Sequence, residues 1–267
     1  MEPLRNAYLD ALGIDRWVSR NAPAEVAPSP EPAPASGTAA SGAGKGFSGF
    51  RSAPTTQAPS ANPENPFPAP SSLPPSADWA ELRARVAGCT ACAELCRTRT
   101  QTVFGVGNTR AEWLVIGEAP GAEEDRQGEP FVGRAGQLLN AMLLAIGLPR
   151  ETVFIANILK CRPPGNRDPK PEEVSRCLPY LSNQIALLKP RIILAVGRIA
   201  AQNLLSTDAP LARLRGKLHT FGDANTPLVI TYHPAYLLRT PSDKRKAWED
   251  LKFARATHAR VTAGGTS

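Results

Sequence analysis

Residues 117–139, GEAPGAEEDRQGEPFVGRAGQLL, combine glycines, acidic side chains and one aromatic side chain in a single segment. Glu118 directly follows an apolar run, and from this position its carboxylate can point into a cleft. Gly117 and Gly121 allow a ligand to approach the backbone more closely than a side chain would permit. The segment has no GxxxxGK[ST] sequence and its acids would repel phosphate, so it is not a phosphate-binding loop. Phe131 is either a core residue or a surface for stacking.

Four of the five cysteines form a pattern that could bind a metal. Cys89 and Cys92 make a CxxC pair, Cys161 follows a later apolar run, and Cys177 lies in a helical pattern. On spacing alone, this set could hold either zinc or an iron–sulfur cluster. Cys96 is either a small buried apolar residue or a substitute ligand, and we favour the buried residue.

Apolar runs rich in β-branched residues alternate with helical patterns in the rest of the chain. The runs are WLVIG (113–117), VFIANIL (153–159), RIILAVG (191–197) and PLVITYH (227–233). Helical patterns occupy residues 78–89, with Asp78 as a possible N-cap, and residues 135–147, 171–189 and 197–205. This alternation predicts an α/β fold with three layers, α/β/α, around a central, mostly parallel four-stranded sheet. Ligands of such sheets bind beyond the carboxyl ends of the strands.

Composition divides the chain into four segments. Residues 1–20 have the apolar spacing of an amphipathic helix, which either docks onto a protein partner or packs on the main domain; we favour docking. Residues 21–77 are rich in proline, alanine and serine and predict a disordered linker. Residues 78–258 should form the folded domain, and residues 259–267 a flexible tail.

The formal net charge is +7, which fits an anionic partner such as nucleic acid or a merely soluble basic protein. No stretch approaches the roughly 20 apolar residues of a membrane-spanning helix. The N-terminus also lacks the apolar core of a secretory signal. We therefore expect a cytoplasmic protein without a membrane association, in a compartment where disulfides are rare.

The chain carries four separated motifs in a fixed order: GEAPGAEED, GEPFVGRAGQLL, NILKCRPPGNRDP and HPAYLLR. Together they resemble the family 4 uracil-DNA glycosylases, the iron–sulfur branch of the uracil-DNA glycosylase superfamily. The resemblance covers about residues 88–251 and none of residues 1–77. It implies a structural 4Fe–4S cluster, held by Cys89, Cys92, Cys161 and Cys177.

The resemblance also implies hydrolysis of the N-glycosidic bond of deoxyuridine in DNA, which releases uracil and starts base-excision repair. The nucleotide must first be flipped out of the duplex. Phe131 would then stack on the base, the backbone amide of Ala119 would contribute to the pocket, and Asn157 would read N3–H and O4 and reject cytosine. His233 would stabilise negative charge on uracil O2. Glu118 would activate the attacking water or stabilise the sugar cation.

Other titratable side chains near these motifs receive smaller roles. Asp125 is a weaker alternative for the catalytic carboxylate. Glu123 and Glu124 fit a solvated acidic loop. His219 and His258 have no comparable sequence context, and we expect them at the surface or in packing.

Two segments are expected to contact DNA outside the pocket. One is the loop after the second apolar run, whose cations could bind phosphates or could be ordinary solvated charges: Lys160, Arg162, Arg167 and Lys170. The other is the RTPSDK segment (239–244) that follows HPAYLLR and would reach the DNA groove, with Leu237, Leu238 and Arg239 near the gap left by the flipped base.

A non-catalytic iron–sulfur module that binds DNA beside a polymerase is the alternative. Glu118, Phe131, Asn157 and His233 together favour the enzyme, because a pure binder does not need them. No lysine is identified for strand cleavage, so the product should be an abasic site. We expect a nucleoid-associated monomer that acts on uracil-containing DNA, single- or double-stranded.

Overall fold

The computed structural model describes residues 74–264; the predicted N-terminal helix and nearly all of the predicted linker lie outside them. The strands are β1 (Val106–Gly107), β2 (Trp113–Gly117), β3 (Phe154–Asn157), β4 (Ile192–Val196), β5 (His219–Phe221) and β6 (Thr226–Thr231). The α-helices are α2 (Trp79–Ala87), α3 (Ala93–Thr98), α4 (Ala122–Gln127), α5 (Arg134–Ala145), α6 (Pro171–Leu188), α7 (Arg198–Leu205), α8 (Leu211–Leu214), α9 (Pro234–Arg239) and α10 (Lys244–Gly264). Three short 3-10 helices are η1 (Arg150–Thr152), η2 (Pro164–Asn166) and η3 (Pro241–Asp243).

The strands form one sheet in the order β1-β3-β2-β4-β6-β5. The four central strands are parallel, and β1 and β5 pair antiparallel at the two edges. The described residues thus contain a six-stranded sheet, and the prediction of four strands was wrong. The missing two are only two and three residues long, too short to show a hydrophobic period.

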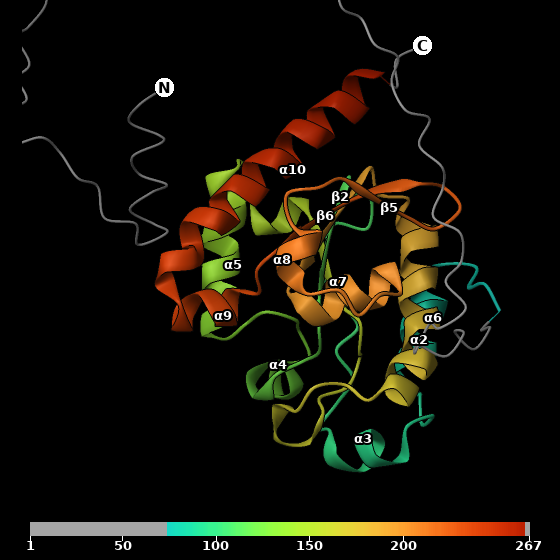
Figure 1. Ribbon diagram of the computed structural model, residues 1–267. Coiled ribbons are helices and arrows are strands. Elements are labelled where there is room, and N and C mark those ends of the chain that lie inside the picture. Colours follow the sequence, from blue (N-terminus) through green and yellow to red (C-terminus); the bar gives the residue numbers. More distant parts are fainter. Residues whose placement is uncertain (1–73, 265–267) are drawn as a thin grey trace, which may run out of the picture. The chain divides into compact units, whose positions relative to one another are not determined.

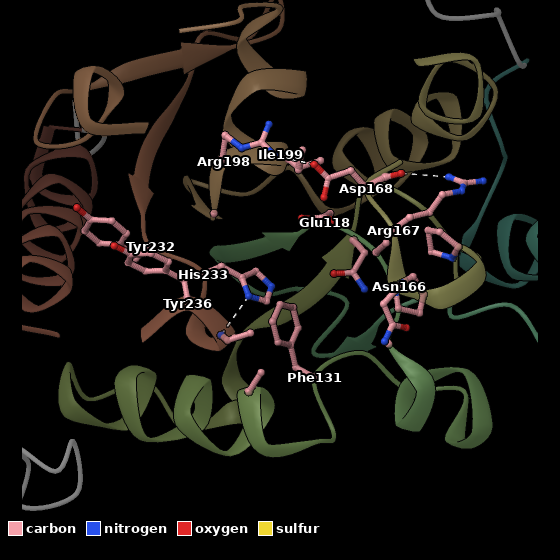
Figure 2. Close-up of a pocket in the computed structure, with 18 of the residues that line it drawn as sticks. Glu118, Phe131, Asn166, Arg167, Asp168, Arg198, Ile199, Tyr232, His233 and Tyr236 are labelled. Carbon is pink, nitrogen blue, oxygen red and sulfur yellow. Dashed lines mark hydrogen bonds and ion pairs between the residues drawn. The ribbon is translucent and has the colours of Figure 1, made fainter. Parts of the chain in front are cut away.

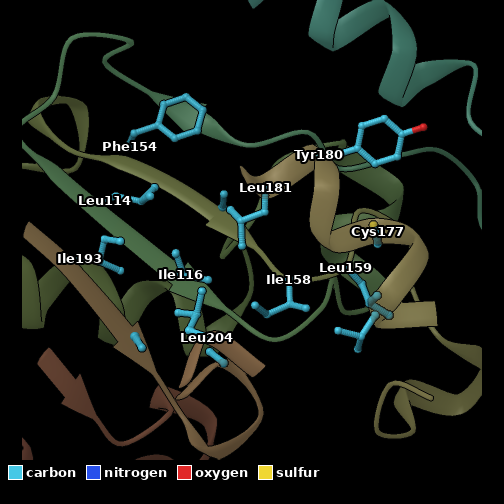
Figure 3. Close-up of a cluster of buried hydrophobic side chains, with 14 of the residues drawn as sticks. Leu114, Ile116, Phe154, Ile158, Leu159, Cys177, Tyr180, Leu181, Ile193 and Leu204 are labelled. Carbon is cyan, nitrogen blue, oxygen red and sulfur yellow. The ribbon is translucent and has the colours of Figure 1, made fainter. Parts of the chain in front are cut away.

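Helices cover both faces of the sheet (Figure 1), which confirms the predicted three-layer α/β/α class. Leu114 and Ile116 of β2 face α2, α6 and α7, whereas Trp113 and Val115 face α5 and α10. Figure 3 shows the first of these clusters, where side chains of α6 and α7 pack on β2 and β4. Because both faces are buried, the central strands are apolar at nearly every position.

The longer elements begin and end close to their predicted bounds. Asp78 caps α2 by accepting a hydrogen bond from the Glu81 backbone N–H at 2.8 Å, as predicted. At the other end, α10 extends to Gly264 and passes the boundary predicted at residue 258. Within residues 74–264, none of the helices combines the length and the hydrophobicity that a bilayer span requires.

Candidate functional site

The carboxyl ends of the four parallel strands surround a cavity of about 790 Å³. Gly117 at the end of β2 is in register with Asn157 at the end of β3, so the residues that follow both strands lie at the same level. All five side chains or backbone groups that the sequence assigned to a uracil pocket line this one cavity (Figure 2): Glu118, Ala119, Phe131, Asn157 and His233.

Gly117 makes room for the two groups that form the floor of the cavity. A Cβ atom at this position would lie 2.4 Å from Asn157 Oδ1 and 2.5 Å from Phe131 Cζ. Contacts this short do not occur between real atoms, so only glycine lets the ring and the carboxamide lie against the strand end.

Phe131 is held in place by its backbone. Its φ of 55° is unusual for a residue other than glycine. The Arg150 guanidinium donates to the carbonyl oxygens of Pro130 and Phe131, at 2.6 and 3.3 Å. A Cβ atom on Gly136 would lie 1.8 Å from the Phe131 oxygen. The ring is therefore fixed before any ligand binds, as a stacking surface requires.

Asn157 has a buried polar atom with no partner. Its side chain is 2 % exposed, and Oδ1 accepts no hydrogen bond from any residue that the structure describes. An unsatisfied buried acceptor costs about 1–3 kcal/mol. A ligand with an N–H group beside Phe131 would remove this cost, so the carboxamide is available for recognition.

His233 is positioned to act as a neutral hydrogen-bond donor. Its Nδ1 accepts a hydrogen bond from the Ala235 backbone N–H at 3.1 Å, which leaves the proton on Nε2. Burial lowers the pKa of His233 to about 4, so the ring is uncharged near neutral pH. The centroids of the His233 and Phe131 rings lie 5.7 Å apart, so Nε2–H and the aromatic surface can contact the same ligand.

Glu118 has the properties of a general base near neutral pH. Burial, helped by the negative charge of Asp168, raises the pKa of Glu118 to about 7, while Arg198 opposes the rise. Arg198 Nη2 and Asp168 Oδ2 form an ion pair of 2.7 Å at the rim of the cavity (Figure 2). Both residues line the cavity, and neither was predicted from the sequence. Arg198 directly follows Gly197 after β4, so its place at a strand end was a usable signal.

The other acids of this segment hold the loop together. Asp125 is 3 % exposed and accepts hydrogen bonds from the Thr100 backbone N–H, so the alternative catalytic role for it was wrong. Glu124 accepts from the backbone N–H groups of Gly121, Val132 and Gly133 and is not a solvated loop residue. Glu123 is exposed and pairs with Arg126, as a solvated acid does.

The cationic loop after β3 was expected either to bind phosphates or to carry ordinary solvated charges, and of its four cations only Lys160 is buried. Lys160 is 1 % exposed and cannot reach DNA. Arg167 pairs with Glu94 and Glu173, and Lys170 pairs with Glu94. These ion pairs join the loop to α3 and α6, a role that the spacing of the charges does not reveal.

The segment after β6 also divides into buried and exposed residues. Leu237 is 1 % exposed and belongs to the core, so its predicted position near the flipped base was wrong. Leu238 is 37 % exposed, and Arg239 lines the cavity. His219 contacts the Leu214 carbonyl, and His258 contacts Glu112, both away from the cavity.

The four predicted metal ligands line a second, smaller hollow between α2, α3 and α6: Cys89, Cys92, Cys161 and Cys177. Arg99 Nη1 donates to Cys161 Sγ at 2.8 Å, and the Lys160 backbone N–H donates to Cys177 Sγ at 3.1 Å. Donors aimed at sulfur stabilise thiolates, so the residues fit a group with soft thiolate ligands. Within residues 74–264, no group of three or more His, Cys, Asp or Glu side chains is arranged to hold a metal ion, so the fit rests on the type of ligand and on the donors beside the sulfurs. Cys96 does not line this hollow.

Comparison with known proteins decides the family. Residues 104–252 match the model of the "Uracil DNA glycosylase superfamily". The type-4 uracil-DNA glycosylase of Archaeoglobus fulgidus is 44 % identical over 173 residues, which are 62 % of this chain and 86 % of the relative. The chain belongs to the uracil-DNA glycosylase superfamily.

Other relatives place it in the type-4 branch. The type-4 enzyme of Pyrobaculum aerophilum is 43 % identical over 180 residues, or 65 % of this chain and 91 % of that enzyme. A type-5 enzyme of Thermus thermophilus is 34 % identical over 119 residues, which are only 39 % of this chain. The predicted resemblance to the type-4 (family 4) uracil-DNA glycosylases is therefore confirmed.

Proposed function

We propose that this protein is a uracil-DNA glycosylase that hydrolyses the N-glycosidic bond of deoxyuridine in DNA, leaves an abasic site and starts base-excision repair. The observation that carries the proposal is the unpartnered Asn157 Oδ1, buried beside a fixed Phe131 ring and a neutral His233. These groups match the N3–H, the face and the O2 of a flipped uracil. Membership of the superfamily supports the same activity.

Base recognition follows from the carboxamide. Asn157 can accept from uracil N3–H and donate to O4, whereas cytosine presents an acceptor at N3 and an amine at C4. The Phe131 ring would stack on the base, which is worth about 1–3 kcal/mol. The backbone amide of Ala119 would line the edge of the same subsite.

Bond cleavage leaves negative charge on uracil O2 and positive charge on the sugar. The His233 Nε2–H would donate to O2, and loss of such a donor typically lowers the rate about 10²–10³-fold. Glu118 would accept a proton from the attacking water or stabilise the sugar cation. A pKa of about 7 keeps enough carboxylate for either role near neutral pH.

The cysteine site is proposed to hold a 4Fe–4S cluster through Cys89, Cys92, Cys161 and Cys177. When bound, the cluster would supply folding free energy rather than redox chemistry. Its ligands come from the α2–α3 segment, the loop after β3 and α6, so binding would join three separate parts of the chain. The resemblance of the sequence motifs to the iron–sulfur branch of the superfamily and the Arg99 donor at Cys161 support this assignment.

The remaining proposals concern the domain boundaries, the oligomeric state and the cellular location. Residues 78–258 are proposed as the glycosylase domain. The enzyme is proposed to act as a monomer. We place the enzyme in the cytoplasm on the nucleoid, where its substrate would lie.

The test is incubation of the purified protein with an oligonucleotide that contains one uracil, followed by alkali. Cleavage at uracil, its absence from the matched thymine oligonucleotide and its loss in Asn157→Ala are expected. Asn203→Ala, which changes a buried amide outside the cavity, is the control. An active Asn157→Ala variant would contradict the assigned recognition. An inactive wild type with a full complement of iron would contradict the function.

A further inference from the structure

Lys160 is a buried cation for which the proposed reaction has no use. It follows Asn157 by three residues and is 1 % exposed. Its Nζ donates to the Asn157 carbonyl oxygen at 2.9 Å and to Gln184 Oε1 at 2.6 Å. Both acceptors are neutral, and no ion pair of Lys160 with a carboxylate is found in the described part of the chain. Burying an ammonium on neutral acceptors is costly, so an apolar residue would serve packing better.

The lysine bonds fix one peptide group of the recognition site. In the Asn157–Ile158 peptide group, the Asn157 carbonyl oxygen accepts a hydrogen bond from Lys160 Nζ. The Ile158 N–H of the same peptide group donates to the Gly117 carbonyl oxygen at 2.9 Å. Because a peptide group is planar, holding its oxygen and its nitrogen fixes ψ of Asn157. The direction of the carboxamide then depends on side-chain torsions alone, and Gly117 and Phe131 confine those.

The same residue is connected to the cysteine site. Its backbone N–H donates to Cys177 Sγ at 3.1 Å. Gln184, which holds the ammonium, donates from Nε2 to the Phe104 carbonyl at 2.9 Å. Thiolates bound to a metal group would place negative charge beside the ammonium and offset the cost of its burial.

We propose that Lys160 is a positioning residue that holds Asn157 in the orientation that reads uracil and links this orientation to the four-cysteine site. The inference rests on the proposed function. It gives the buried charge a specific role, because the ammonium is bonded to the recognition residue on one side and its own backbone is bonded to a cysteine ligand on the other.

Lys160→Met tests the inference, because methionine keeps an unbranched side chain, one atom shorter, and removes both hydrogen bonds of Nζ. We expect free uracil to inhibit the variant about tenfold more weakly than wild type or worse, since the Asn157 carbonyl loses its buried donor. Discrimination between uracil and cytosine in DNA should also fall. Less iron and sulfide should be retained per chain. Leu251→Ala, a core change on α10, should lower stability and leave the inhibition constant for uracil unchanged.

A second variant keeps the test decisive if Lys160→Met does not fold. Gln184→Met retains the ammonium but removes one of its two acceptors, so uracil inhibition should weaken in the same direction by a smaller factor. If wild type releases uracil from DNA and the variants that fold bind uracil as tightly as wild type does, Lys160 has no positioning role. If wild type neither releases nor binds uracil, the proposed function fails as well.

Discussion

Replacing Glu118 with glutamine should stabilise the protein more at high pH than at low pH. Burial and Asp168 raise the pKa of Glu118 from 4.5 to about 7, so the folded state binds this proton more tightly than the unfolded state does. In wild type, the stabilising contribution of Glu118 to the free energy of unfolding is therefore complete below pH 4.5. It is lost as the pH rises through about 7. Glutamine does not titrate, so the variant does not lose stability in this way.

The size of the effect follows from the shift. Each pKa unit corresponds to about 1.4 kcal/mol, and the full shift to about 3 kcal/mol. Between about pH 5.5 and pH 8.5, the contribution of Glu118 to the free energy of unfolding of wild type falls by about 2 kcal/mol, and the variant has no such loss. For a domain of this size, 1 kcal/mol moves Tm by about 2–4 °C. The Tm difference between Glu118→Gln and wild type should thus grow by about 4–8 °C over this range.

Calorimetry of the complete protein at both pH values measures this difference. Glu151→Gln, which changes an exposed acid on η1, is the matched control and should melt in parallel with wild type at both pH values. A Tm difference for Glu118→Gln that stays constant from pH 5.5 to 8.5 would refute the reasoning, because it would mean that folding does not alter the proton affinity of Glu118.

Three further predictions concern activity on uracil-containing DNA. Asp168→Asn removes a negative charge near Glu118, so the acid limb of the kcat/KM profile should move to lower pH; an unchanged profile would contradict this coupling. Gly117→Ala places a Cβ atom 2.4 Å from the recognition carboxamide and should reduce kcat/KM by roughly 10²-fold or more, whereas Gly88→Ala, with its nearest contact at 3.6 Å, should have no effect. Leu238→Ala removes an exposed apolar side chain near the cavity and should slow cleavage of duplex more than of single-stranded substrate; equal effects on both would exclude a role in base extrusion.

The sequence predicts the central sheet because its strands are long, apolar on both faces and separated by helices. It also predicts the recognition residues, since Glu118, Asn157 and His233 each lie at or just after the end of a parallel strand and must meet at one edge. The edge strands escape prediction because two or three residues show no period. Lys160 was assigned to the surface because lysine is rarely buried, and only the tertiary structure shows the hydrogen bonds that permit it.

Ion pairs between loops are the other part that the sequence does not reveal. Asp168 and Arg198 are 30 residues apart and meet only because the loop after β3 and the start of α7 border the same cavity. Glu124 looks like a solvated acid, yet it accepts hydrogen bonds from two backbone N–H groups of the loop that carries Phe131 and from the Gly121 N–H at the start of α4. Such partners depend on the packing of distant segments, which local patterns do not encode.

Two features of the cavity lower the stability of the fold, and hydrogen bonds from neighbouring residues hold each of them in place. Phe131 has an unfavourable φ, and Arg150 and Glu124 hold its loop by four hydrogen bonds in total. Asn157 leaves an acceptor unsatisfied, and its peptide is fixed from both sides. A site that must bind an extruded base has to be rigid before the base arrives, because the energy of binding already opposes the cost of unstacking. The four-cysteine site lies close to the end of β3 in the chain, since Cys161 follows Asn157 by four residues. The free energy of metal binding would therefore stabilise the strand end at which recognition occurs.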